Sequence, residues 1–191
     1  MTVTPTIRVD KRQQRVLERT LEGVRDGVPR ATDGAIKKTG RTVRTRVRRA
    51  TAKNLNVTQK ELKQESRFNL DFRRDGRWVV GAKVSVTGGR LPLKRFAPRQ
   101  TKRGVSFRAR GGGRKTITSA FISRKLGGQV FSRVSSSRLP IVRLDSASAP
   151  EAALNDAKVR QTSNRQAPNL LQANLDNQVD RLLKRSGRGS S

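Results

Sequence analysis

The sequence contains no cysteine and no histidine. Without cysteine the chain can form no disulfide, and it offers no thiolate as a nucleophile or metal ligand. Without histidine it lacks the commonest metal ligand and the side chain used most often as a general base. These two absences argue against most hydrolases and metalloenzymes. We therefore expect a protein without catalytic residues, cofactor or metal.

Long apolar stretches are missing as well. No segment approaches the roughly 20 apolar residues that a membrane-spanning helix needs. The first residues, Met1 to Pro5, do not form the basic segment followed by an apolar one that a secretory signal would show. We expect no membrane contact, and a protein made in a cytoplasm that works there or in a particle assembled there.

Acidic residues are scarce, and the charge imbalance is large. Lysine and arginine number 44 against 14 aspartates and glutamates, a formal net charge of +30. Such a charge opposes the compact state unless anionic groups offset it, so we expect the protein to work inside an assembly. Its 191 residues suit one domain with extensions. We divide it into a basic helical part (1–65), a β-rich core with a basic glycine-rich loop (66–145), and C-terminal helices with a flexible tail (146–191).

Apolar spacing predicts an N-terminal helical hairpin. Residues 11–26 carry an apolar stripe at helical intervals, and Gly27-Val28-Pro29 is expected to end this helix. The second helix is expected to begin near Thr32-Asp33. Its seam consists of residues spaced by four and three: Ile36, Gly40, Val43, Val47 and Ala50.

One flank of the second helix is basic. No acidic residue occurs between Ala35 and Lys60, so little neutralises this flank. This flank is either exposed only to solvent or binds a polyanion or an acidic protein. The residues of this secondary basic face are Lys37, Arg41, Arg44 and Arg48.

Further along the chain the apolar period changes. Thr58 and Glu61 have the spacing of a capping box for a short third helix ending near Glu65. Alternation from Phe68 to Phe72, then Asp75-Gly76, predicts a hairpin with the following strand. Five more short strands are expected at 91–96, 105–110, 120–124, 130–134 and 139–144.

The C-terminal part is predicted to be helical. Ser148 and Glu151 again have capping-box spacing, and residues 161–166 read as a linker. Pro168 suits the first turn of a last helix, whose stripe is Leu171, Leu175, Val179 and Leu182. The sequence thus predicts an α+β fold, in which an N-terminal helical hairpin packs on an antiparallel, partly barrel-like sheet and C-terminal helices follow.

Two Arg-Leu-Pro segments, at 90–92 and 138–140, enclose the most basic and glycine-rich part of the chain. They are either neighbouring edge strands or a coincidence. Seven basic residues between them are candidates for contact with a DNA backbone or with a partner protein: Arg99, Lys102, Arg103, Arg108, Arg110, Arg114 and Lys115. Base reading is less favoured, because Phe96, Phe107 and Phe121 alternate like core residues.

Motifs for other chemistry are weak. The run Gly111-Gly112-Gly113-Arg114-Lys115-Thr116 lacks the spacing of a Walker phosphate loop. No carboxylate occurs between Gly76 and Val142, whereas general acid–base pairs and two-metal sites need clustered carboxylates. A nucleotide-binding or catalytic role is therefore disfavoured.

The centre of the chain resembles a known family. The segments Arg95 to Ser106, Ala120 to Ile122 and Arg138 to Ile141 are similar to the minor tail protein Z family of tailed bacteriophages. The likeness continues upstream through Arg44 to Val47 and Ala52 to Val57, and covers roughly residues 30–147. Pro98 departs from the family pattern, where another small residue is expected.

The resemblance implies a non-enzymatic virion protein that completes the tail at its head-proximal end. Its implied partners are the tail terminator and the head-tail connector, in a homo-oligomeric ring of six copies, with non-specific contact to the DNA backbone in the channel. The rival interpretation is a cytoplasmic basic nucleic-acid-binding protein of ribosomal or nucleoid type. A DNA-processing enzyme is a distant third. Whether residues 99–115 face DNA or protein stays open.

Overall fold

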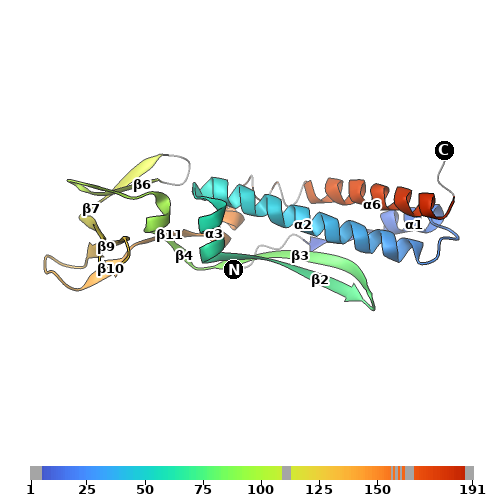
Figure 1. Ribbon diagram of the computed structural model, residues 1–191, viewed down its shortest axis with the longest axis horizontal. Helices are drawn as coiled ribbons and strands as arrows, with labels where there is room; N and C mark the ends of the chain where they lie inside the picture. Colours follow the sequence, from blue (N-terminus) through green and yellow to red (C-terminus); the bar gives the residue numbers. More distant parts are fainter. Residues whose placement is uncertain are drawn as a thin grey trace. The chain divides into compact units, whose positions relative to one another are not determined.

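A computed structural model describes residues 6–108, 113–155, 157, 159, 161 and 166–187. The chain folds into two compact units. The β-rich unit comprises residues 48–67 and 86–156, and the helical unit comprises residues 2–47, 68–85 and 157–191. Figure 1 shows the elements of both. The predicted α+β class is confirmed, with five α-helices and four small antiparallel sheets among the described residues.

In the helical unit, α1 (Lys11–Thr20) begins at a capping box. Asp10 Oδ1 accepts from the backbone N of Gln13 at 2.7 Å, and Gln13 Oε1 accepts from the backbone N of Asp10 at 3.1 Å. This pair satisfies two donors at the helix start that would otherwise lack partners. Of its apolar stripe, Leu17 is buried, as is Leu21 directly after the helix.

The second helix, α2 (Gly27–Leu55), begins earlier than the sequence predicted. Gly27-Val28-Pro29 starts α2, so the expectation that these residues end the first helix and that the second begins near Thr32 was wrong. Proline is tolerated there because the first-turn N–H groups have no partner within the helix. The predicted seam is confirmed: Ile36, Val43 and Val47 have no exposed surface.

The three-stranded sheet of the helical unit has the order β1 (Thr6–Ile7), β3 (Trp78–Gly88), β2 (Ser66–Asp75). Helix α2 packs on it at Gly40, where a Cβ atom would lie 2.9 Å from Leu70 Cδ1. The backbone N of Val79 also donates to Asp33 Oδ1 of α2 at 2.9 Å. Thus the predicted packing of a helix on an antiparallel hairpin is confirmed.

The last helix, α6 (Gln166–Arg185), packs on α2. Leu171, Leu175 and Leu182 are buried, and Asn174 Nδ2 donates to Thr39 Oγ1 of α2 at 2.9 Å in the interior. The predicted stripe is therefore confirmed, with Pro168 in the first turn.

The β-rich unit contains the end of α2, the capped helix α3 (Gln59–Glu65) and helix α4 (Ala149–Asn155). In this unit β4 (Arg90–Pro92) pairs with β11 (Asp145–Ser148). The 3-10 helix η1 (Leu93–Phe96) follows β4, so the strand predicted over 91–96 is too long. Both Leu93 and Phe96 are buried in the core. Their burial favours the compact helical turn over an extended strand.

The remaining strands form two sheets. One has the order β5 (Arg99–Thr101), β6 (Gly104–Arg108), β7 (Arg114–Thr118). The other has the order β10 (Ile141–Arg143), β9 (Gln129–Arg133), β8 (Ala120–Ser123). Neither closes on itself among the described residues, so the barrel-like detail of the prediction was wrong. The two Arg-Leu-Pro segments are not paired: residues 90–92 form β4, which pairs with β11, whereas residues 138–140 precede β10 and belong to no strand.

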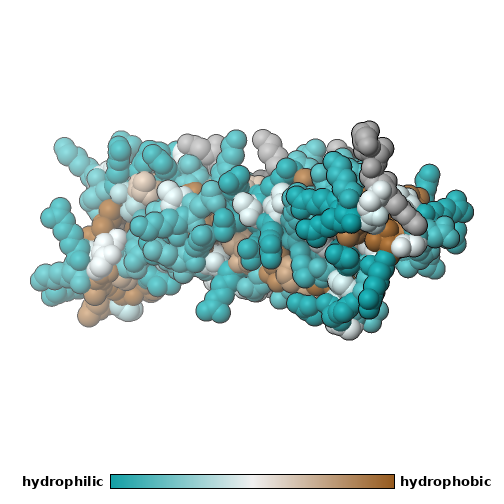
Figure 2. Space-filling view, turned by 45° about the vertical axis from the view of Figure 1, so that its right-hand side comes forward, coloured by the Kyte–Doolittle hydropathy of each residue, from teal (hydrophilic) through white to brown (hydrophobic). Residues whose placement is uncertain are grey.

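The face seen in Figure 2 is largely hydrophilic. Apolar atoms gather at its left-hand end, where Figure 1 shows the strands β9 and β10. Large exposed apolar residues in and around these strands are Leu126, Val134, Leu139 and Val142. No described helix is long and apolar enough to cross a membrane.

Candidate anion-binding sheet

The segment expected to be a basic loop is mostly a three-stranded sheet. Residues 99–101, 104–108 and 114–118 are the strands β5, β6 and β7, and only the part around 109–112 lies outside the described residues. Strand β6 confirms the strand predicted from residue 105, whereas the loop prediction was wrong for β5 and β7. Arg110, one of the seven candidates, lies outside the described residues as well.

Strand register sorts the basic side chains onto two faces. Arg99 lies opposite Ser106, Ser106 opposite Thr116, and Arg108 opposite Arg114. Residues directly opposite each other in antiparallel strands project to the same face. We call the face that carries Arg99, Arg108 and Arg114 the basic face.

The opposite face of the sheet carries the apolar side chains that are buried or half-buried. Val105 has no exposed surface, and Phe107 and Ile117 are half-buried. Lys115 lies opposite Phe107 and so projects to this second face, although it is exposed. Among the described candidates on strands, only Lys115 is separated from the three arginines in this way.

Three residues of the segment form a network that holds the β5–β6 turn, and we call them the turn network: Gln100, Thr101 and Gly104. The carbonyl O of Gly104 accepts from Thr101 Oγ1 at 2.9 Å and from Gln100 Nε2 at 3.2 Å. Gln100 Oε1 accepts from the backbone N of Ile122 at 3.0 Å, which ties the turn to β8. This arrangement fixes the turn that carries Lys102 and Arg103.

Position 104 has room for glycine alone. Its φ is +145°, and a Cβ built there would lie 2.1 Å from the carbonyl O of Ile117 on β7. L-residues with a side chain rarely adopt such a φ, and the contact is far inside van der Waals distance. The glycine therefore permits the close approach of β6 and β7.

Arg114 is engaged within the fold. Its Nε donates to Ser106 Oγ at 3.0 Å, and its Nη2 donates to the carbonyl oxygens of Ser106 at 2.8 Å and Ala97 at 3.0 Å. Ala97 has a left-handed backbone with φ of +45°, where the chain leaves η1. Arg114 thus ties the turn at Ala97 to the sheet, and most of its N–H donors are used in these bonds.

The other basic residues of this surface are differently placed. Within the described part of the chain, no hydrogen bond or ion pair of the side chain engages Arg99, Lys102, Arg103 or Arg108, and all four are exposed. Arg108 lies directly opposite Arg114, and like charges in that position destabilise a strand pair. An anion bound at the basic face would relieve this repulsion.

The secondary basic face on α2 is partly used by internal contacts. Lys37 Nζ pairs with Asp33 Oδ2 at 2.8 Å, and Arg48 Nε donates to Gln59 Oε1 at 3.2 Å. Arg41 is exposed and Arg44 is half-buried. Lys37, Arg41 and Arg44 belong to the helical unit and Arg48 to the β-rich unit.

Two further arginines of the β-rich unit have partners that the sequence analysis did not foresee. Arg133 lies over the ring of Phe121 at 4.8 Å from its centroid, and Phe121 stands 6.1 Å from Phe131. Arg143 forms a two-pronged pair with Asp145, with N–O distances of 2.9 and 3.0 Å. The hydrogen bonds and charge of Asp145 raise the pKa of Arg143, so it stays cationic.

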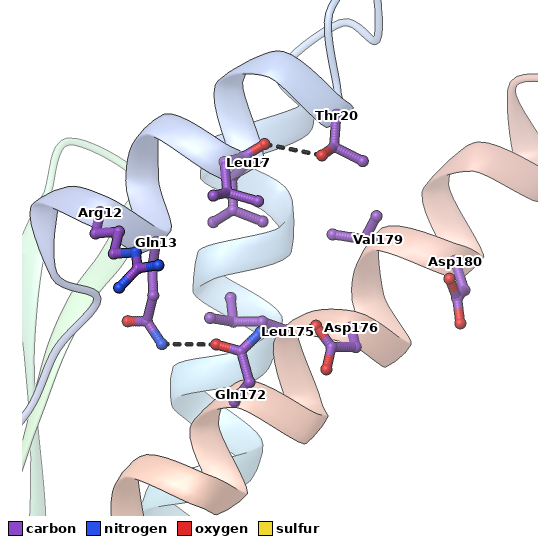
Figure 3. A pocket seen from close by; sticks show the side chains of 10 residues that line it. Arg12, Gln13, Leu17, Thr20, Gln172, Leu175, Asp176, Val179 and Asp180 are labelled. Atoms are coloured by element: carbon purple, nitrogen blue, oxygen red, sulfur yellow. Dashed lines mark hydrogen bonds between the residues drawn. The ribbon is translucent and has the colours of Figure 1, made fainter.

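The sequence analysis also missed a groove between α1 and α6 (Figure 3), which is lined by side chains of both helices. Its only sequence signal is the pair Asp176 and Asp180, spaced by four on a helix of a chain that is poor in acidic residues. Among the described residues, no group of three or more aspartates and glutamates is placed to hold a metal ion.

Comparison with protein-family models, with curated proteins and with solved structures finds no match for this chain.

Proposed function

We propose that this chain is a structural protein of a tailed bacteriophage particle, which completes the tail at its head-proximal end. In this role the basic face and the adjoining turn contact an anionic neighbour, either the DNA backbone in the channel or an acidic surface of a neighbouring ring. The tail terminator and the head-tail connector are the proposed neighbours. Six copies in a ring, as the resemblance to the minor tail protein Z family implies, belong to the same proposal.

The proposal is carried by the structural roles of the segment Arg95 to Ser106, which resembles the minor tail protein Z family. Phe96 is buried, Arg95 pairs with Glu65 at 2.8 Å, and the turn network holds the β5–β6 turn. These are scaffold roles, which keep a rigid turn in place with Lys102 and Arg103 exposed. A motif of this kind suits a protein that presents a charged surface to neighbours.

The chemistry of the basic face favours backbone contact over base reading. Arginine side chains on a short sheet can donate to phosphate or carboxylate oxygens, and such contacts position a protein without reading sequence. The rings of Phe96 and Phe107 are at least half-buried and therefore not free to stack on bases.

A first experiment tests whether the protein is part of the phage particle. Particles released from the strain that carries the gene are purified and analysed by quantitative mass spectrometry, beside ribosome and nucleoid fractions of the same lysate. We expect a small fixed copy number per particle, and we expect deletion of the gene to leave heads and tails that do not join. Enrichment with ribosomes or nucleoid in place of particles would favour the rival nucleic-acid-binding interpretation.

A second experiment separates DNA contact from protein contact at the basic face. In the variant Arg99→Gln/Arg108→Gln, binding to double-stranded DNA should lose affinity, and the slope of log K against log salt should fall by about 1.8, since each phosphate contact contributes about 0.9. The matched control is Arg124→Gln/Lys125→Gln, which removes the same charge from the exposed β8–β9 turn. Equal slopes in both variants would exclude DNA as the ligand of this face and favour an acidic protein.

A further inference from the structure

The groove between α1 and α6 has an apolar floor. It has a volume of about 540 Å³, and its apolar lining consists of Leu17, Leu175 and Val179, which are labelled in Figure 3, together with Val16. Val16 is 57% exposed, so most of this apolar side chain has no cover from the described residues. The two helices are joined across the groove by Gln13 Nε2, which donates to Gln172 Oε1 at 2.8 Å.

The two walls of the groove carry opposite charges. Arg12 stands on the α1 side, and three more basic residues of α1 line a second hollow beside Val16: Lys11, Arg15 and Arg19. Asp176 and Asp180 stand on the α6 side. Asp176 accepts a hydrogen bond from Gln172 at 2.8 Å and both aspartates are exposed.

This surface is less basic than the rest of the chain. Residues 10–20 hold four basic and two acidic side chains, a net charge of +2, and residues 166–185, which form α6, hold two acidic and three basic side chains, a net charge of +1. The two segments together carry +3, whereas the whole chain carries +30. The repulsion that opposes contact between copies is therefore weaker here than elsewhere on the chain.

We propose that the α1–α6 face binds the same face of a second copy of this chain. When a two-fold axis relates the two copies, the basic α1 wall of each copy meets the acidic α6 wall of the other. Val16 of each copy is then covered by the groove of its partner. A two-fold contact needs this kind of self-complementary patch. A strongly acidic partner would be repelled by the α6 wall and a strongly basic one by the α1 wall, so a partner with both walls fits best.

The proposed interface between the two copies is small, so the test needs a high protein concentration. The ten-residue α1 is only about 15 Å long, so the buried area lies at the low end of specific interfaces. We expect a dissociation constant in the micromolar range, and the measurement needs protein concentrations up to about 100 μM. The pairing is independent of the proposed function, and it would not by itself close a ring.

The test uses sedimentation equilibrium and native mass spectrometry on the full chain. The variants Arg12→Asp/Arg15→Asp and Asp176→Arg/Asp180→Arg should each weaken self-association at least tenfold, because like charges then face each other. A 1:1 mixture of the two should restore the dimer mass, since each altered wall then meets a complementary one. Far-UV circular dichroism checks that both variants are folded.

The matched control is Arg124→Asp/Lys125→Asp, which changes the net charge as much as the first variant but lies in the β-rich unit. It should self-associate like the unaltered chain. An unaltered chain that stays monomeric at 100 μM would overturn the proposal. So would charge-reversed variants that dimerise like the control, or a mixture that does not recover the dimer.

Discussion

Replacing Gly104 with alanine should open the β5–β6–β7 sheet. The native φ of +145° at this position is adopted almost only by glycine, and a methyl group there would lie 2.1 Å from the carbonyl O of Ile117 and 3.1 Å from the Cα of Thr118. Both contacts are with backbone, which cannot turn aside as a side-chain end can. Strand β7 would have to retreat from β6, and the pairing of Val105 with Ile117 would be lost.

The cost can be built from two parts. Backbone strain at such a φ contributes about 1–3 kcal/mol. The carbonyl of Gly104 accepts hydrogen bonds from Thr101 and Gln100, and losing each of them costs about 0.5–1.5 kcal/mol. The midpoints of these ranges sum to a loss of about 4 kcal/mol in the local stability of the sheet, which corresponds to an increase of roughly several hundredfold in its opening constant.

Hydrogen–deuterium exchange followed by mass spectrometry measures this directly, because it reports opening segment by segment. Peptides covering 99–108 and 114–118 should exchange at least a hundredfold faster in Gly104→Ala. The matched control is Gly113→Ala, where no atom of the described residues outside its chain neighbours lies within 4 Å of the added Cβ. Equal protection of the sheet in both variants would refute the role given to Gly104.

Two further predictions concern side-chain hydrogen bonds. Arg114→Gln and Arg114→Lys should both lower the local stability of the sheet by about 1–2 kcal/mol, because neither keeps the forked contact with Ser106 and Ala97; an unaffected lysine variant would show that charge alone matters. In the helical unit, Asn174→Ala should cost about 1–3 kcal/mol by leaving the buried Thr39 hydroxyl without its donor, and Thr39→Val in that background should cost much less than alone. Urea unfolding followed by the fluorescence of Trp78 checks this pair, and additive losses would contradict it.

The helices were the most predictable part of the fold. In α6 the leucines 171, 175 and 182 recur at helical intervals and are buried on one side, so the sequence pattern and the packing agree. The start of α2 was mistaken because Gly27-Val28-Pro29 suits a helix end and a first helical turn equally well. Which of the two applies depends on tertiary packing: a Cβ at Gly27 would lie 2.9 Å from Leu21 Cβ.

Strand β6 was predicted because Val105 and Phe107 alternate with polar residues, but β5 and β7 were missed because their residues do not alternate in this way. In β7, Ile117 is the only large apolar residue, and the pairing that makes the segment a strand comes from β6. Arg99 and Arg108, which the sequence made candidates for contact with an anionic partner, are exposed, and that contact stays a prediction. It could not show that Arg114 is bound by the carbonyl of Ala97, since that contact depends on how the chain turns after η1.

The central claim is that this chain is part of the phage particle at the head-proximal end of the tail. A cryo-electron microscopy map of the head-tail junction, taken from particles with and without the gene, tests it most directly. We predict density that fits the β5–β6–β7 sheet and the long helix α2 at the junction. In the deletion, we predict tails that lack this density and remain unattached. Complete, joined particles without the gene product would contradict the claim.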